Sequence, residues 1–209
     1  MSRRTTAIAA AFTLLALGSP LMTSCADSLP LEIQYYNQGV DKYDAGNYQG
    51  AIDDYTKAID VDPQHAEAYY NRGKAKYDLL DYQGAIGDYA KAIEINPQYA
   101  KAYYNRGFAK YELGNYQGAI DDLTKAIEID PIASAYYNRG VAKDYLEDYQ
   151  GAIADYTKAI EIDPDDASAY TNRGISRVLV NDRKGACDDW RKSANLGHVN
   201  AAVLVETKC

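Results

Sequence analysis

The chain is 209 residues long and acidic, with 30 Asp and Glu residues against 22 Lys and Arg residues and a formal net charge of −8. An acidic surface repels phosphate groups, so this composition argues against a nucleic-acid partner. The aromatic residues are 21 Tyr, 2 Phe and 1 Trp, which is unusual because most protein cores are filled by Leu, Ile and Phe.

Residues 1–25 have the pattern of an export signal. Two Arg residues precede the apolar run 7–17, which is too short to cross about 30 Å of hydrocarbon as a helix. Residues 21–25, LMTSC, resemble the lipobox of bacterial lipoproteins, in which the Cys becomes the lipidated first residue. The Leu here lies four places before the Cys instead of the usual three. We therefore expect a lipid anchor on Cys25, with ordinary signal cleavage or an uncleaved segment as the alternatives.

A short linker, residues 26–31, leads into a pattern of about 34 residues that occurs five times. Its glycine recurs at Gly39, Gly73, Gly107, Gly140 and Gly174, and its closing proline at Pro63, Pro97, Pro131 and Pro164. In the second unit, Ala66–Leu80 and Gln83–Ile95 place apolar or aromatic residues at helical spacing. The proline ends the second helix, because the residue before a proline disfavours helical geometry. One such helix pair cannot bury its apolar face alone, so the pairs must stack.

The unit resembles the tetratricopeptide repeat, a 34-residue helix–turn–helix, over about residues 32–197. The resemblance implies an all-α fold, a right-handed α-solenoid of five helix-turn-helix repeats plus a C-terminal capping helix. The expected repeats are residues 32–63, 64–97, 98–131, 132–164 and 165–197, with the capping helix in residues 198–209. A solenoid needs such a cap over its last apolar face.

The chain departs from the family pattern in two columns of the first helices. An Arg stands directly before the Gly in four repeats, where Leu is usual, and a basic residue stands three positions after it. A partly buried Arg needs a carboxylate partner, and the second helix of every repeat carries an Asp. The first repeat has Gln38 instead of Arg and no preceding helix, which favours pairing with the preceding repeat. The expected pairs are Arg72 with Asp54, Arg106 with Asp88, Arg139 with Asp122, and Arg173 with Asp155; pairing within each repeat is the close alternative.

Two cysteines remain once Cys25 is lipidated or removed. Cys187 stands where earlier repeats have an inward-facing Ile, and Cys209 closes the expected capping helix. Counting residues at 1.5 Å per helical position brings the two sulfurs within reach. An even pair of cysteines in an exported protein favours a disulfide, so we expect one between Cys187 and Cys209. A buried thiol and a separate free thiol are the alternative.

The sequence offers no catalytic constellation. His65 and His198 are far apart in the sequence, and neither has a Cys or carboxylate motif around it. The carboxylates recur with the repeat, which indicates a structural role, and no nucleotide-binding loop is present. We therefore expect a protein that is not an enzyme and has no cofactor and no metal site.

The first helices of tetratricopeptide-like repeats line the concave wall of the superhelix, and in that family the wall usually receives an extended peptide or a helix. Tyr and Asn dominate the corresponding columns here. The richest part of the wall is expected at Tyr36, Asn37, Tyr43, Tyr70, Asn71, Tyr77, Tyr104, Asn105 and Tyr111. Tyr suits interface anchors, and a row of Asn amides can bond the backbone of a strand. The alternative is that the Tyr rings fill the seam between neighbouring first helices and the Asn residues bond locally.

Two functions follow from this reading. The first is a non-catalytic interaction scaffold or adaptor in the bacterial cell envelope that binds another exported protein, in the periplasm or on the outer membrane, or secreted. The second is a glycan- or peptidoglycan-binding envelope protein, because Tyr faces can stack on sugar rings. Membrane contact is expected only through the lipid anchor, and weak self-association is a lesser expectation.

Overall fold

The computed structural model describes residues 29–209. The expected export signal and the expected lipidation site, Cys25, lie outside this part of the chain. Residues 29–209 form eleven helices and no strand, which confirms the all-α prediction. The helices are α1 (Leu31–Asp44), α2 (Tyr48–Val61), α3 (Ala66–Asp78), α4 (Tyr82–Ile95), α5 (Ala100–Glu112), α6 (Tyr116–Ile129), α7 (Ala133–Tyr145), α8 (Tyr149–Ile162), α9 (Ala167–Leu179), α10 (Arg183–Asn195) and α11 (Val199–Lys208).

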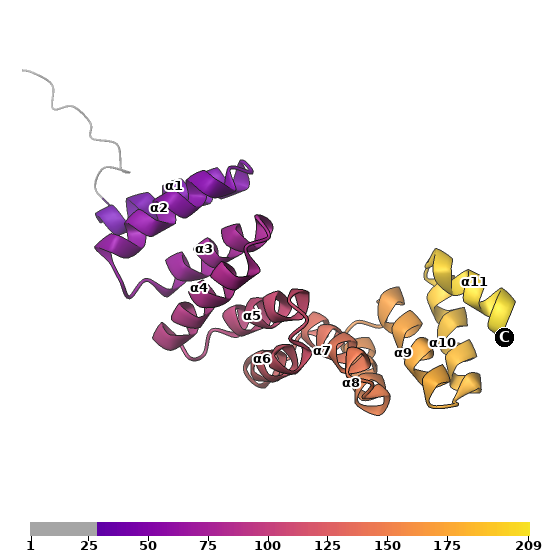
Figure 1. The fold of residues 1–209 in the computed structure, drawn as a ribbon. Coiled ribbons are helices and arrows are strands. Elements are labelled where there is room, and N and C mark those ends of the chain that lie inside the picture. Colours follow the sequence, from indigo (N-terminus) through magenta and orange to yellow (C-terminus); the bar gives the residue numbers. More distant parts are fainter. Residues whose placement is uncertain (1–28) are drawn as a thin grey trace, which may run out of the picture.

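The helices form five hairpins in a row, from α1–α2 to α9–α10, and α11 packs on the last one (Figure 1). Helices α1, α3, α5, α7 and α9 are called the first helices, and α2, α4, α6, α8 and α10 the second helices. Each second helix contacts its own first helix; α2, α4, α6 and α8 also contact the first helix of the next hairpin, and α10 contacts α11. The chain is therefore a solenoid whose core is built at each hairpin and each seam. None of its described helices has the length and apolar character needed to span a bilayer.

A capping side chain fixes the start of every second helix. The capping residues are Asn47, Asp81, Asn115, Asp148 and Asp182, and each accepts a hydrogen bond from the backbone N–H three positions later. The residue at that position is always Gly. A Cβ on Gly50 would lie 2.6 Å from Asn47 Nδ2, so a larger residue would displace the cap. The recurring Gly after Tyr-Gln thus serves helix capping.

A second glycine, in the middle of each first helix, allows the two helices of a hairpin to approach closely. A Cβ on Gly73 would lie 2.8 Å from the ring of Tyr89, and one on Gly174 would lie 2.5 Å from Trp190. Alanines complete the contact, and Tyr55, Tyr89 and Tyr156 are each only 1% exposed. Tyr rings packed against Gly and Ala therefore fill the core of three hairpins, where most proteins use Leu, Ile or Phe.

The turn inside each hairpin needs one residue in the left-handed region. Gly46 and Gly114 occupy that position in the first and third hairpins, with φ of 76° and 74°. Leu80, Glu147 and Asn181 occupy it in the others, with φ of 63°, 62° and 66°. A side chain with a Cβ is strained in this conformation, whereas Gly is not.

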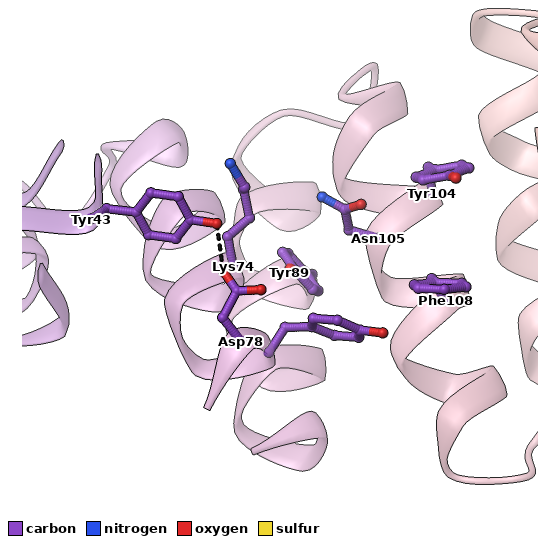
Figure 2. Close-up of a pocket in the computed structure, with 8 residues that line it drawn as sticks. Tyr43, Lys74, Asp78, Tyr89, Tyr104, Asn105 and Phe108 are labelled. Atoms are coloured by element: carbon purple, nitrogen blue, oxygen red, sulfur yellow. Dashed lines mark hydrogen bonds between the residues drawn. The ribbon is translucent and has the colours of Figure 1, made fainter. Parts of the chain in front are cut away.

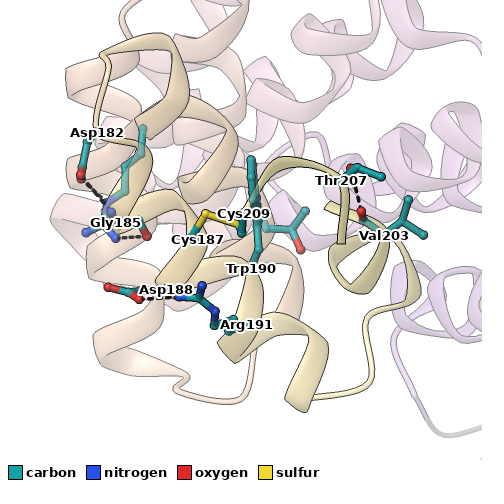
Figure 3. The surroundings of a disulfide bond; sticks show 11 residues. Asp182, Gly185, Cys187, Asp188, Trp190, Arg191, Val203, Thr207 and Cys209 are labelled. Atoms are coloured by element: carbon teal, nitrogen blue, oxygen red, sulfur yellow. Dashed lines mark hydrogen bonds and ion pairs between the residues drawn. A yellow bond between two sulfur atoms is a disulfide. The ribbon is translucent and has the colours of Figure 1, made fainter. Parts of the chain in front are cut away.

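The last hairpin is joined to the closing helix by sulfur atoms. Cys187 on α10 and Cys209 after α11 form a disulfide, with their Cα atoms 5.7 Å apart (Figure 3). The bond links residues 22 positions apart. It holds the end of α11 against α10, as the sequence-based prediction required.

Candidate binding wall

The predicted wall residues lie on the first helices and meet along the seams between them. Asn71 Nδ2 on α3 donates a 2.7 Å hydrogen bond to the Tyr36 hydroxyl on α1. The same bond recurs at each later seam: Asn105 to Tyr70 at 2.9 Å, Asn138 to Tyr104 at 2.8 Å, and Asn172 to Tyr137 at 3.0 Å. We call this series the Tyr–Asn ladder.

The ladder answers the question that the sequence left open. The Asn amides bond locally, to the Tyr hydroxyl of the preceding repeat, which is the structural alternative. Each Asn uses one N–H in this way, and none of their side-chain oxygens accepts a hydrogen bond within residues 29–209. Asn37 is exposed and the other predicted wall residues are half-buried. The ladder therefore holds neighbouring first helices together and leaves acceptor oxygens along the wall.

The lower row of tyrosines forms a second set of contacts across the seams. The Tyr43 hydroxyl donates to Asp78 on the next first helix, and Lys74 Nζ lies 4.6 Å from the centre of the Tyr43 ring. Burial, followed by the bond to Asp78, raises the pKa of Tyr43, so its hydroxyl stays protonated and able to donate at neutral pH. The row ends at the fourth repeat, where Asp144 stands in the place of the Tyr.

A slot opens on the wall where these rows meet. It has a volume of about 250 Å³ and lies between α1, α3 and α5 (Figure 2). Its lining residues include Tyr43, Lys74, Tyr77, Asp78, Asn105 and Phe108. A second slot of about 290 Å³ follows one repeat later, with Phe108 and Tyr111 on one side and Asn138 on the other. Aromatic faces, one cation and amide or carboxylate oxygens therefore line the wall together.

Sequence reasoning missed Lys74, Asp78 and Phe108 as wall residues. They lie three or seven positions after the first-helix Asn of their repeats, on the same helix face. That spacing could have identified them, but the residue type at these positions varies among the repeats, so a search for recurring residue types passes over them.

The Arg–Asp ladder exists, but the predicted register is wrong. Arg106 Nε and Nη2 donate to both carboxylate oxygens of Asp122 in the same repeat, at 2.8 and 2.6 Å. The other two-point pairs also lie within one repeat: Arg72 with Asp88, Arg139 with Asp155, and Arg173 with Asp189. The expected pairs Arg72–Asp54, Arg106–Asp88, Arg139–Asp122 and Arg173–Asp155 are not formed. The reason is that each Asp is buried on the face of the second helix that packs on its own first helix.

In the first repeat Lys57 takes the place of the Arg, beside Lys42, whose equivalents also pair with the Asp in the later repeats. Asp54 is fully buried, and Lys42 and Lys57 both approach its carboxylate, Lys57 at 2.7 Å. Burial alone would raise the pKa of Asp54, but the hydrogen bonds from Lys42 and then Lys57 lower it by more. The Asp is therefore an anchor for basic side chains in every repeat. Within residues 29–209 no group of His, Cys, Asp or Glu side chains is arranged to hold a metal ion.

Hairpins that stack through nearest neighbours and present aromatic slots along one wall define a helical repeat solenoid of the interaction type. The tetratricopeptide repeat family models match residues 36–100, 100–131 and 133–166. The chain belongs to the tetratricopeptide repeat family.

Several solved structures are similar to this chain. A crystal structure of MamA is 30% identical, with a TM-score of 0.74, and covers 78% of this chain and 96% of its own. MamA from Desulfovibrio magneticus RS-1 is 25% identical, with a TM-score of 0.76, and covers 80% of this chain and 96% of its own. YrrB, described as a tetratricopeptide repeat protein with an unusual peptide-binding site, is 21% identical; it has a TM-score of 0.75 and covers 84% of this chain and 91% of its own, a likeness that shows the fold alone. No curated protein sequence matches the chain.

Proposed function

We propose that this protein is a non-catalytic adaptor of the bacterial cell envelope that holds an extended or helical segment of another exported protein along the wall. The family is one of interaction scaffolds, which supports a protein partner. The export signal read from residues 1–25, with the expected lipid anchor at Cys25, supports the envelope. YrrB, which has the same fold, is described by its peptide-binding site.

The slot between α1, α3 and α5 is the observation that carries the proposal. It joins the faces of Tyr77 and Phe108 to the cation of Lys74 and to the oxygens of Asn105 and Asp78. Aromatic rings supply apolar contact at little cost in side-chain entropy. The amide oxygens that the Tyr–Asn ladder leaves without a hydrogen bond can accept from the backbone N–H groups of a bound segment.

The test uses wall residues that take no part in the Tyr–Asn ladder. Asn71→Ala and Asn105→Ala are poor probes, because each would also break a bond of the Tyr–Asn ladder. We expect Lys74→Ala combined with Phe108→Ala to weaken partner capture by about tenfold or more, which corresponds to about 1.4 kcal/mol. Capture is measured by crosslinking in envelope extract followed by mass spectrometry, with circular dichroism to confirm folding.

The matched control is Lys91→Ala, which removes an exposed lysine from the second helix α4. It should leave capture unchanged. If the wall variant and the control capture the same proteins equally well, the wall is not the binding site. The glycan-binding alternative would be supported instead if the purified protein sedimented together with cell-wall material and the Lys74→Ala and Phe108→Ala variant did not.

A further inference from the structure

The C-terminal end of the wall has a second kind of slot. It lies between α9, α10 and α11, with a volume of about 480 Å³, and is larger than the two aromatic slots described above. Its lining includes Ile175, Val178 and Leu179 from α9, Trp190 from α10 and Leu204 from α11. Cys187 also lines it, so the disulfide to Cys209 holds in place the side of the slot that α11 forms (Figure 3).

Part of this slot is equivalent in the repeat pattern to the part of the earlier slot that α3 and α5 line. Lys74, Tyr77 and Asp78 on α3 correspond to Ile175, Val178 and Leu179 on α9, each 101 positions later, as 175 − 74 = 101. Leu204 is the sixth residue of α11 and Asn105 is the sixth residue of α5. Lys74, Tyr77, Asp78 and Asn105 of the earlier slot thus have apolar counterparts in this one.

The apolar groups of this slot are open to water. Ile175 is 42% exposed, Val178 38% and Leu179 52%. Adjacent apolar side chains with this exposure, on a helix face that lines a slot, are typical of an interaction surface. The indole of Trp190 is buried behind them and donates to the Thr171 carbonyl.

The rim of the slot carries positive charge. Arg183 at the start of α10 and Lys208 at the end of α11 both line it, and neither forms an ion pair within residues 29–209. The carboxylate of Asp182 interacts with other groups, because it caps α10 and lies 3.6 Å from Arg177. Glu206 is two positions from Lys208, and such positions do not share a helix face. The whole chain has a net charge of −8, so this positive rim is a local feature. An apolar slot with a cationic rim favours a ligand that carries an apolar group next to negative charge.

We infer that this slot docks a bulky apolar side chain flanked by carboxylates, contributed by an acidic segment of a partner protein. The apolar side chain fills the space in front of Trp190, and its acidic neighbours meet Arg183 and Lys208. The inference rests on the proposed function in that the ligand is a protein segment, but it concerns a different part of the wall.

The position of Trp190 makes the inference directly testable. It is the one Trp of the chain, so a change in Trp emission reports on this slot and not on the slot at Lys74. The probe is a synthetic hexapeptide with Leu-Phe between two pairs of Glu, titrated into the oxidised protein. We expect a saturable change in emission. The same peptide with Lys in place of Glu should bind at least about tenfold more weakly.

Two variants convert the slot to the chemistry of an earlier repeat. Val178→Tyr and Leu179→Asp introduce the residues that α3 has at the equivalent positions, Tyr77 and Asp78, so the fold is expected to tolerate them. Each should weaken binding of the Glu peptide by about tenfold or more. The Lys74→Ala and Phe108→Ala variant should bind the peptide like the wild type, which separates failure of this inference from failure of the proposed function.

Three results would overturn the inference. The first is no emission change with the Glu peptide up to millimolar concentration. The second is equal binding of the Glu and Lys peptides, which would remove the role of the cationic rim. The third is unchanged binding by both Val178→Tyr and Leu179→Asp, which would place the peptide elsewhere.

Discussion

Arg72 Nη1 donates a 3.1 Å hydrogen bond to Thr56 Oγ1, on the second helix of the preceding repeat. The same guanidinium makes its two-point pair with Asp88 in its own repeat, so one side chain ties two repeats together. Arg139 and Arg173 repeat the bond, to Thr124 at 3.0 Å and to Thr157 at 3.1 Å. The relationship also accounts for Gln38, because within residues 29–209 no helix precedes α1 to supply the threonine.

The second seam, between α4 and α5, lacks this bond and offers a site for stabilisation. Ala90 stands on α4 where α2, α6 and α8 have Thr, and Arg106 donates hydrogen bonds only to Asp122. We expect Ala90→Thr to stabilise the protein by about 1 kcal/mol. A hydrogen bond to a charged donor contributes about 1.5–3 kcal/mol, and the lower helix propensity of Thr costs about 0.7 kcal/mol. Urea unfolding provides the measurement, and Ala90→Val, which has the same shape without the hydroxyl, should stabilise nothing.

The register of the Arg–Asp ladder predicts which pairs are energetically coupled. In a double-mutant cycle, Arg106→Gln and Asp122→Asn should show a coupling energy of about 1–3 kcal/mol, because they remove the two ends of one buried pair. Arg106→Gln with Asp88→Asn should be close to additive. Strong coupling in the second cycle and none in the first would favour the register first expected from the sequence.

The turn residues with positive φ predict that introducing a glycine there stabilises the protein and that removing one destabilises it. Leu80 is 71% exposed and has φ of 63°, so its side chain adds strain and little packing. We expect Leu80→Gly to raise the free energy of unfolding by up to about 1 kcal/mol, within the 1–2 kcal/mol that an L-residue pays there. Thermal unfolding measures it. The reverse change at the equivalent site, Gly114→Leu, should destabilise, and the prediction fails if both substitutions change stability in the same direction.

Asp144 predicts a pH dependence of stability. It accepts hydrogen bonds from the Tyr156 hydroxyl at 2.7 Å and from Ser176 Oγ at 2.8 Å, and burial raises its pKa above the ordinary value of 3.8. The folded state therefore holds the proton more tightly than the unfolded state. This contribution to stability is complete below the ordinary pKa and is lost as the pH rises through the folded-state pKa.

The variant Asp144→Asn keeps an acceptor oxygen and carries no charge. Its stability relative to the wild type should therefore increase as the pH rises from about 3 to about 7. Denaturant unfolding at several pH values measures the difference. Asp148→Asn would disturb the cap of α8, so Asp163→Asn, at the exposed end of α8, is the better control and should show no such trend. A flat difference for Asp144→Asn across this pH range would contradict the assignment.

The disulfide predicts a local loss of stability on reduction. A crosslink that closes a loop of this length contributes about 3 kcal/mol through the unfolded chain. We expect reduction, or Cys187→Ser with Cys209→Ser, to remove amide-exchange protection from α11 and to leave α1–α8 unchanged. Mass spectrometry of the oxidised protein provides the independent check, since two free thiols would refute the bond.

The period of the sequence repeat was enough to predict most of the fold. The positions of Gly, Ala and Pro in the sequence are enough to predict a helical hairpin in each repeat, because close helix contact needs small residues at fixed places. The pairing of Cys187 with Cys209 followed from simple helix lengths. These features depend on backbone geometry, which the sequence pattern specifies directly.

The polar contacts were harder to predict. Periodicity shows that Arg106 and Asp122 face the core, but a period of one repeat is equally consistent with Asp88 as the partner. The hydrogen bond from Asn71 to Tyr36 was hard to predict for the same reason, because the spacing of the two residues in the sequence does not show that they meet at the seam. In a solenoid every residue has an equivalent one repeat away, so the partner of a side chain can be predicted only when the packing of the helices is known.

The nearest-neighbour stacking of the hairpins gives this molecule the mechanics of a series of hinges. A small rotation at one seam, where Arg72 meets Thr56 and Asn71 meets Tyr36, adds to the rotations at the others. The two ends of the solenoid can therefore move apart or together by much more than any single contact changes. The adaptor proposed above would adjust its pitch to the segment that it binds, and tension on its ends would be shared among the seams.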